Sequence, residues 1–309
     1  MSTLLDVIVP VFLIIGFGYF TVWVRVFSID TIEGLMKFSQ NFAIPVLLFN
    51  AIAKVDLANI LDLNLFFSFY LGAAAGFLIG FVGSHYLFNR TLEDSVTIGF
   101  CCLFSNTVML GLPITERAYG EDALLHNFAI VSIHAPFCYF LGITIMELIK
   151  STEKSINKKG IVIMKAMFSN ALLAGIVLGF LFNICGINLA KPIQTSIDMI
   201  VAVALPVALF GMGGILYQYR PEGDIGPITM ICAVSLLVHP AIVWVTGMNL
   251  ELSDVQIRSA VITAAMAPGI NTYVFANMYG TTKSVVSTGV LLATILSIGT
   301  VWMWLNLLP

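Results

Sequence analysis

Residues 105–113 read SNTVMLGLP, and residues 267–275 read APGINTYVF. Each stretch lies inside a long apolar segment, and a Tyr-Gly pair follows each one, at 119–120 and at 279–280. Proline and glycine at such points break a helix. Lipid supplies no partner for the freed backbone groups, so irregular backbone at membrane depth survives only inside protein or beside a wet cavity. Two interrupted helices in corresponding parts of one chain therefore indicate the substrate site of a transporter.

The composition is that of a membrane protein. The chain has 309 residues, of which 59% are hydrophobic and only 10% are charged, and its mean hydropathy is +0.99. These values lie far outside the range of a soluble domain. We expect an all-α integral membrane protein with ten transmembrane helices, because a spanning helix needs about 20 apolar residues and the sequence offers ten such stretches. They are 5–24, 32–53, 65–88, 95–117, 123–149, 161–183, 193–216, 226–248, 258–279 and 284–307.

The cysteines argue against a zinc site, and the first apolar stretch is not expected to be a signal peptide. All five cysteines lie in apolar stretches without the spacing of a zinc site, so they predict small buried side chains and neither a metal nor a cofactor. They are Cys101, Cys102, Cys138, Cys185 and Cys232. The first helix has no basic residues before it and no cleavage site after it, so we expect it to be retained rather than removed as a signal peptide.

Positive charges in the loops predict the orientation in the membrane. Lys and Arg are concentrated in loops that face the cytoplasm. One set of loops carries Arg25, Arg90, Lys150, Lys154, Lys158, Lys159, Arg220 and Lys283, and the opposite set carries Lys54, Arg117, Lys191 and Arg258. We therefore expect the loop at 150–160 to face the cytoplasm and both termini to lie outside.

The chain divides into two similar halves. The segment 150–160 is a polar, charged linker between residues 1–149 and residues 161–309. Residues 43–49 read AIPVLLF and residues 204–210 read ALPVALF, 161 positions later, and the two Tyr-Gly pairs recur 160 positions apart. This constant offset predicts two five-helix repeats. Because five is odd, the second repeat enters the membrane upside down, as in the inverted repeats of many transporters. The prolines of the repeated motif, Pro45 and Pro206, are expected either to unwind their helices locally or simply to kink them.

The first interrupted helix is expected to present a helix N-terminus at the membrane midplane. Pro113 has no N–H group and leaves the carbonyl of Met109 without its helical donor. Proline also favours the first turn of a new helix, so we predict that a half-helix starts near Leu112, with Gly111 and Asn106 beside it. The N–H groups at that start form the positive end of a helix dipole.

The second interrupted helix is expected to mirror the first. Pro268 and Gly269 open the backbone, and Asn271 or Thr272 is predicted to cap the half-helix that follows. Residues 95–115 and 259–282 contain no Asp, Glu, Lys or Arg. The site is therefore predicted to consist of amides, hydroxyls and backbone groups, and two helix N-termini beside amide donors suit a carboxylate.

Three amide side chains have a structural interpretation as well as a functional one. Asn106 and Asn271 could simply link helices by hydrogen bonds, but each lies beside a break in one of two corresponding helices, which favours substrate binding. Asn50 follows the repeated motif of the second helix, and it is a candidate for the same site or, alternatively, a helix-capping residue.

Ionisable residues within the apolar stretches are few. Asp198, His134 and His239 are candidates for ion coupling, because ionisable groups inside a membrane are usually functional. The alternatives are that Asp198 lies at the membrane interface and that each histidine is a hydrogen-bonded buried imidazole.

These residues resemble a known family. Residues 106–113 with the following Tyr-Gly pair are similar to the fourth-helix signature of the auxin efflux carrier family, which includes plant PIN-type exporters and bacterial malate or malonate permeases. Residues 42–45 with Phe49 resemble its second helix, and residues 269–270, 273–276 and 287–290 resemble its ninth and tenth helices. The ninth helix departs from the PIN pattern, because Pro268 directly precedes the Gly-Ile pair and Asn271-Thr272 follow it. The resemblance implies ten helices in two inverted repeats, with helices 4 and 9 crossing at the substrate site, a scaffold part and a moving part. It assigns Asn106, Gly111 and Pro113 to the crossing.

The function predicted from these features is transport of a small organic anion, a mono- or dicarboxylate, by alternating access in a bacterial inner membrane. The partners expected are the substrate, lipid, and H⁺ or Na⁺ as a coupling ion, with a homodimer as one arrangement and no nucleic acid. The alternative is a sodium-coupled symporter resembling bile-acid carriers, which should place more acidic ligands at the crossing. An enzyme is not expected, because the sequence has no His-Glu-x-x-His motif and no paired intramembrane aspartates.

Overall fold

The structure is a computed structural model that describes residues 4–54, 62–120, 123–150 and 171–309. These residues form helices, and the extended pairing found among them is an isolated bridge between Ser105 and Pro268. The predicted linker at 150–160 and the beginning of the sixth predicted span lie outside the described residues.

Within the part of the chain that the structure describes, seven helices are long and apolar enough to cross a membrane. This confirms the predicted all-α, membrane-spanning character of the chain. The seven are Asp6–Trp23, Ile29–Lys54, Leu63–Phe88, Leu124–Lys150, Lys191–Leu216, Ile225–Asn249 and Lys283–Leu307. The predicted spans at 95–117 and 258–279 each consist of two shorter helices, and Ala171–Ile184 is a shorter apolar helix beside the undescribed segment.

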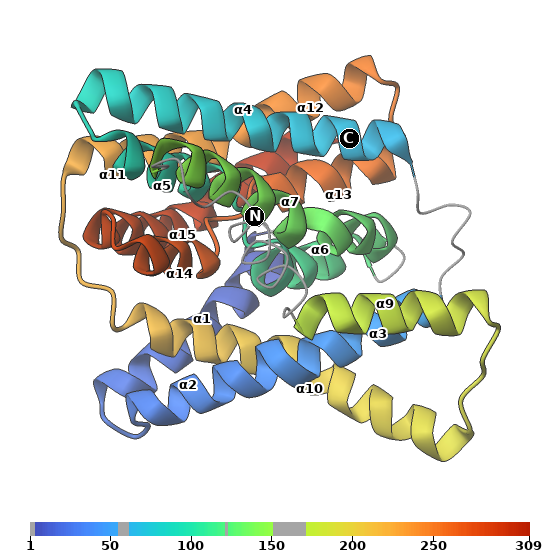
Figure 1. The fold of residues 1–309 in the computed structure, drawn as a ribbon. Coiled ribbons are helices and arrows are strands. Elements are labelled where there is room, and N and C mark those ends of the chain that lie inside the picture. Colours follow the sequence, from blue (N-terminus) through green and yellow to red (C-terminus); the bar gives the residue numbers. More distant parts are fainter. Residues whose placement is uncertain (1–3, 55–61, 121–122, 151–170) are drawn as a thin grey trace. The chain divides into compact units, whose positions relative to one another are not determined.

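The helices pack into two compact units. Unit 1 contains the described residues of 1–9, 62–163 and 219–309, and unit 2 contains those of 10–61 and 164–218. Each unit thus combines helices from both predicted halves of the sequence, as the mixture of colours in Figure 1 makes visible. Packing therefore divides the chain differently from the predicted repeat.

Unit 1 contains the two interrupted helices. In Figure 1, α4 lies alongside α12, and α4 also packs against α5. Small residues allow this close approach: a Cβ at Gly76 would lie 3.0 Å from the carbonyl oxygen of Cys102. The elements of unit 1 are α4 (Leu63–Phe88), α5 (Leu92–Leu103), η4 (Thr107–Gly111), α6 (Leu112–Tyr119), α7 (Leu124–Lys150), α11 (Ile225–Ala233), η6 (Val234–Val238), α12 (His239–Asn249), α13 (Asp254–Ala264), α14 (Asn271–Tyr279) and α15 (Lys283–Leu307), with η1 (Leu4–Ile8) at its N-terminal end.

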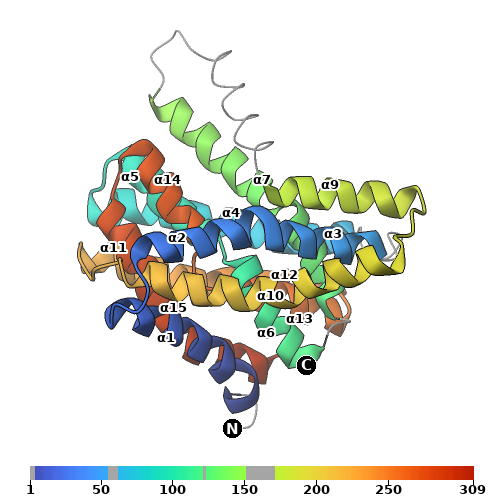
Figure 2. The same ribbon diagram turned by 90° about the horizontal axis from the view of Figure 1, so that it is seen from below.

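Unit 2 is built on close helix contacts. The helices α3 and α9 lie side by side in both views (Figures 1 and 2), and α10 packs along α2 and α3. A Cβ at Gly18 would collide with the carbonyl of Phe210, and one at Gly213 would collide with the carbonyl of Ile15. Glycine is therefore required where α1 crosses α10. The elements of unit 2 are α1 (Val9–Trp23), α2 (Ile29–Phe38), η2 (Ser39–Ala43), α3 (Ile44–Lys54), α9 (Ala171–Ile184) and α10 (Lys191–Leu216).

Wide π-helical turns precede four prolines. The segments η1, η2, η4 and η6 each end two residues before a proline, namely Pro10, Pro45, Pro113 and Pro240. In three of them the residue before the proline donates its N–H five residues back, from Ile44 to Ser39, from Leu112 to Thr107 and from His239 to Val234. The wider turn accommodates the missing proline donor. The helix α10 continues through Pro206, so the predicted unwinding occurs beside Pro45 and not at Pro206.

Candidate functional site

Two helices of unit 1 stop in the middle of their apolar segments. The first, α5, ends at Leu103, and the chain then continues into η4 and α6. The second, α13, ends at Ala264, and the chain then continues into α14. The new half-helices both end at a glycine with a positive φ, 84° at Gly120 and 72° at Gly280. Glycine is suited to this left-handed ending, which explains the two Tyr-Gly pairs in the sequence.

The two interruptions pair with each other. Ser105 and Pro268 form an antiparallel bridge. The Asn106 N–H donates to the Ala267 carbonyl at 2.9 Å, and the Gly269 N–H donates to the Phe104 carbonyl at 3.0 Å. Backbone groups that the breaks release from their helices are therefore satisfied by each other, as a site away from bulk water requires. We call this pairing the crossing.

Asn106 begins the first half-helix. Its side-chain oxygen accepts a hydrogen bond from the Met109 N–H at 3.3 Å, and its carbonyl accepts from the N–H groups of Leu110 and Gly111. The first half-helix thus consists of the π-helical turn η4, which begins at Thr107, and of α6, which begins at Leu112 as predicted. The turn η4 ahead of Leu112 was not predicted, and the Asn106 side chain caps its start. Asn106, Gly111 and Pro113 are all buried at the crossing.

The second half-helix starts without a side-chain cap. It begins at Asn271, and neither Asn271 nor Thr272 accepts a hydrogen bond from its first N–H groups. Thr272 is fully buried and instead donates its hydroxyl to the Gly269 carbonyl at 2.7 Å. The predicted cap is therefore wrong, because the open backbone at Pro268 and Gly269 supplies a closer acceptor. Asn271 is partly exposed, and its amide forms no hydrogen bond with other described residues.

Both candidate histidines contact the crossing. His134 Nε2 lies 3.2 Å from the Ser105 carbonyl oxygen, which can only accept, so Nε2 carries a proton. His239 Nδ1 lies 3.4 Å from the Ser105 hydroxyl, which also donates to the Ala264 carbonyl at 3.2 Å. The Phe69 ring contacts both imidazoles edge-on, with its centroid 5.6 Å from each of theirs. These are the contacts of buried imidazoles that support the crossing strand, and a coupling role stays a prediction.

A buried polar cluster around Asn127 lies beside the crossing and was not predicted from the sequence. The Asn127 amide nitrogen lies 3.1 Å from Thr115 Oγ1 and 2.6 Å from Thr263 Oγ1. These residues belong to α7, α6 and α13, and all three are fully buried. Their positions form no motif in the sequence, although an asparagine within an apolar stretch is a signal that could have been followed.

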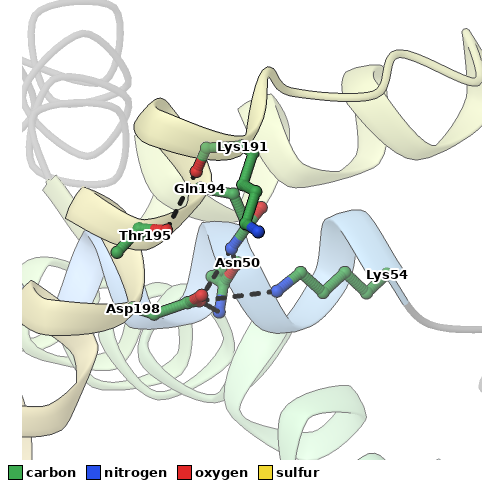
Figure 3. A network of polar contacts seen from close by, with 6 residues as sticks. All are labelled: Asn50, Lys54, Lys191, Gln194, Thr195 and Asp198. Atoms are coloured by element: carbon green, nitrogen blue, oxygen red, sulfur yellow. Dashed lines mark hydrogen bonds and ion pairs between the residues drawn. The ribbon is translucent and has the colours of Figure 1, made fainter.

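Asn50 and Asp198 lie together in unit 2. Gln194 donates to both, at 2.8 Å to Asn50 Oδ1 and 2.7 Å to Asp198 Oδ1. Asn50 and Lys54 approach the same Asp198 oxygen at 3.5 and 3.6 Å (Figure 3). Two residues of α3 and two of α10, each pair one helical turn apart, thus form one network. The sequence identified Asn50 and Asp198 separately but not their contact.

The sequence of the chain is similar to those of known membrane transporters. Residues 3–305 match the family model described as "Membrane transport protein". A Rhizobium meliloti (strain 1021) protein named "Putative malonate transporter" is 22% identical over 313 residues, which cover 97% of this chain and 94% of that protein. "Auxin efflux carrier component 8" of Arabidopsis thaliana is 22% identical over 350 residues, which cover 94% of each chain. An "Uncharacterized transporter" of Methanothermobacter thermautotrophicus is 23% identical over 305 residues, which cover 98% and 96%.

Proposed function

Since the chain belongs to the membrane transport protein family, we propose that it is a secondary carrier of a small organic anion that works by alternating access. The family consists of transporters and not of enzymes, and the apolar helices make the chain an integral membrane protein. The family match and the auxin efflux carrier among its relatives also confirm the resemblance drawn from the sequence motifs.

The crossing is the observation that carries the proposal. The two half-helices begin at Thr107 and at Asn271. Each follows an extended segment, and the two segments pair with each other through Ser105 and Pro268. Their first N–H groups form the positive ends of two helix dipoles. A helix N-terminus is a ready anion site, and neither strand carries a charged residue that would compete. The arrangement supports binding of a carboxylate at the crossing.

The inverted repeat supports alternating access. In this proposal the chain has ten helices in two five-helix repeats, residues 1–149 and 161–309, joined by a cytoplasmic linker at 150–160. Both termini lie outside the inner membrane of a bacterial cell. The antiparallel bridge is consistent with such a repeat, because inverted halves present their broken helices to each other from opposite sides.

The substrate is proposed to be a mono- or dicarboxylate. One relative carries malonate in its name and another carries auxin, and both ligands present a carboxylate to their carriers. The site residues proposed are Asn106, Gly111, Pro113, Pro268, Gly269, Asn271 and Thr272, with Asn50 as a further candidate in unit 2. Side-chain donors at these positions would bind the carboxylate oxygens, whereas Pro113 and Pro268, which have no N–H, would shape the backbone around the site.

The test is a ligand screen with purified full-length protein. Malonate, malate, acetate and an aromatic monocarboxylate are compared with malonamide, a neutral analogue of malonate, by thermal shift in detergent. A ligand at about 100 times its Kd stabilises the native state by about 2.7 kcal/mol. We expect at least one carboxylate to raise Tm in a saturable way and to be taken up by proteoliposomes. Stabilisation by malonamide alone, or by no carboxylate, would refute the anion site.

A further inference from the structure

The helix that carries His239 departs from regular helical structure in three ways. The wide π-helical turn η6 directly precedes His239. His239 has 0% exposure, and its Nε2 atom has no hydrogen-bond partner among the described residues. The Ser235 hydroxyl, one turn earlier, is also buried and also without a partner in this part of the chain. Buried polar groups are nearly always satisfied, and π-helical turns occur frequently at functional sites. The junction of η6 and α12 therefore indicates a role beyond packing.

The other nitrogen of His239 is joined to the crossing. Nδ1 lies 3.4 Å from the Ser105 hydroxyl oxygen, and that hydroxyl donates to the Ala264 carbonyl at 3.2 Å. A hydroxyl has a single proton to donate. Because Ser105 donates it to Ala264, Nδ1 carries the imidazole proton and donates to the Ser105 oxygen. Nε2 is then the deprotonated nitrogen, and its lone pair is free to accept a proton without any change at the crossing.

His134 differs from His239 because both of its nitrogens have partners. Its Nε2 donates to the Ser105 carbonyl at 3.2 Å, and its Nδ1 lies 3.8 Å from the Cys138 sulfur, whose thiol is a weak donor. The two imidazoles are close enough to repel each other when charged, so the pair accepts one added proton more readily than two. The unpartnered Nε2 of His239 is the position in the pair for that proton.

The helices around His239 supply no opposite charge. Neither α4 nor the segment Ile225–Asn249 contains Asp, Glu, Lys or Arg. The charged residues of α13, Asp254 and Arg258, lie in its first two turns, whereas its last residue, Ala264, is the one that contacts Ser105. An added proton at His239 would therefore need a negative charge that the surrounding helices do not provide. The side chains and glycine that face the imidazole are Phe69 and Gly72 of α4, Ser105 of the crossing and His134 of α7.

We propose that His239 is the proton-coupling residue of the carrier: Nε2 takes up one proton from water when an anion binds at the crossing and releases it when the anion leaves. This role rests on the proposed function. Ser105 directly precedes Asn106, which caps the first half-helix, so the imidazole is one hydrogen bond away from the segment proposed to hold the anion. That segment has no Lys or Arg. The imidazolium supplies the missing positive charge, and attraction between unit charges is strong away from water.

Burial makes the coupling strict. A charge at 0% exposure is costly unless an opposite charge lies close to it. His239 should therefore stay neutral while the crossing is empty and become charged together with an anion. By linkage, the proton then favours the anion as much as the anion favours the proton.

The experiment measures proton uptake during carboxylate binding. Malonate, malate, acetate and an aromatic monocarboxylate are titrated into full-length protein in detergent in a calorimeter, each in two buffers with different heats of ionisation. The difference between the two heats gives the number of protons bound. At about pH 7–8 the ligands are ionised, since carboxylic acids titrate near pH 4, so the proton enters the protein. We expect uptake of up to one proton per ligand and binding that tightens as the pH falls, by up to about tenfold per pH unit.

Two histidine variants locate the proton. His239→Asn keeps an N–H that can donate to Ser105 in place of Nδ1 but does not take up a proton, so its carboxylate binding should be independent of pH. His239→Gln is the second variant if asparagine lowers Tm. His134→Gln keeps a donor to the Ser105 carbonyl in place of Nε2 and should retain proton uptake. The matched control is His85→Gln, in the last turn of α4, where the imidazole contacts the Arg90 carbonyl at 3.0 Å. It should behave as the wild type does.

The outcomes separate this inference from the proposed function. Proton uptake that persists in a folded His239→Asn or His239→Gln protein would overturn the assignment, and its loss in His134→Gln alone would move the proton to the other imidazole. Carboxylate binding by the wild type without proton uptake would refute the coupling and leave the anion site intact. Absence of binding by all four carboxylates would refute the proposed function and the coupling with it.

Discussion

Asn106 and Asn271 each lie beside one of the two helix breaks but have different roles in the structure. The Asn106 oxygen caps the first half-helix through the Met109 N–H. Asn271 begins the second half-helix, partly exposed and without a hydrogen bond to the described residues. An amide held within the fold contributes to stability, whereas an amide without an internal partner is available to a ligand. The two residues should therefore respond differently to substitution.

Replacing Asn271 should affect binding and not folding. We expect Asn271→Ala to weaken binding of the anionic substrate about tenfold to a hundredfold, since a hydrogen bond to a charged group contributes about 1.5–3 kcal/mol. Its Tm should remain close to that of the wild type. Asn277→Ala is the control, because Asn277 is an exposed amide further along the same helix. Equal substrate affinity in both variants would remove Asn271 from the site.

Replacing Asn106 should affect both stability and binding. Asn106→Ala removes the cap and should lower the free energy of unfolding by about 0.5–2 kcal/mol. Asn106→Asp separates the two effects, because aspartate caps a helix as well as asparagine does but its charge repels an anion. We expect the aspartate variant, which keeps the cap at a helix N-terminus, to lose less Tm in thermal melts than Asn106→Ala and to lose carboxylate binding. Wild-type affinity in that variant would mean that the anion binds elsewhere.

The sequence predicted these amides but not their surroundings. Proline, glycine and asparagine at the breaks are local signals, so Asn106, Pro113 and Pro268 could be selected without a structure. The contacts of Ser105 with His134 and His239 join the crossing to two separate helices, α7 and α12. Such contacts depend on tertiary packing, for which the local sequence carries no pattern.

At the scale of elements, the first half-helix has two distinct turns. Its first turn, η4, is a wide π-helical turn, and α6 follows it with Pro113 at its second position. The first half-helix ends at Tyr119, and the Arg258 guanidinium lies 5.2 Å from the centre of the Tyr119 ring. The second half-helix, α14, ends at Tyr279, and Lys150 Nζ lies 5.1 Å from the centre of that ring. Cation–π contacts of this kind stabilise both distal ends. The half-helices are therefore fixed at their far ends and begin at the crossing.

Pro113→Ala should impair transport more than folding. Alanine at this position can donate to the Met109 carbonyl, which would narrow η4 to an α-helical turn and rotate Asn106 relative to α6. We expect an equal or higher Tm and reduced substrate uptake by proteoliposomes. The matched control is Pro192→Ala, because Pro192 lies in the exposed first turn of α10, and it should leave uptake unchanged. Normal uptake by a stable Pro113→Ala protein would show that the wide turn is dispensable.

At the scale of the whole molecule, packing and sequence divide the chain differently. The predicted repeat places its boundary between residues 149 and 161, whereas each compact unit takes helices from both sides of that boundary. Similarity between the two halves of the sequence indicates which of their segments correspond. The individual helices could be predicted because the length of an apolar stretch is a local property of the sequence. Which helices pack together depends on contacts such as those of Gly18 and Gly213 with distant carbonyls, and no local pattern encodes these partners.

The native cysteines allow a direct test of the predicted orientation. Four of the five are buried, and Cys185, which lies between α9 and α10, is exposed. If both termini lie outside, the α9–α10 turn also lies outside, because an even number of membrane crossings separates it from the N-terminus. We therefore expect a membrane-impermeant maleimide to label the wild-type protein in intact cells. Cys185→Ser should abolish this labelling. Ser155→Cys in the Cys185→Ser background, on the opposite side, should react only after permeabilisation. Labelling of the Ser155→Cys variant in intact cells, together with a wild-type Cys185 that reacts only after lysis, would reverse the topology and place both termini in the cytoplasm.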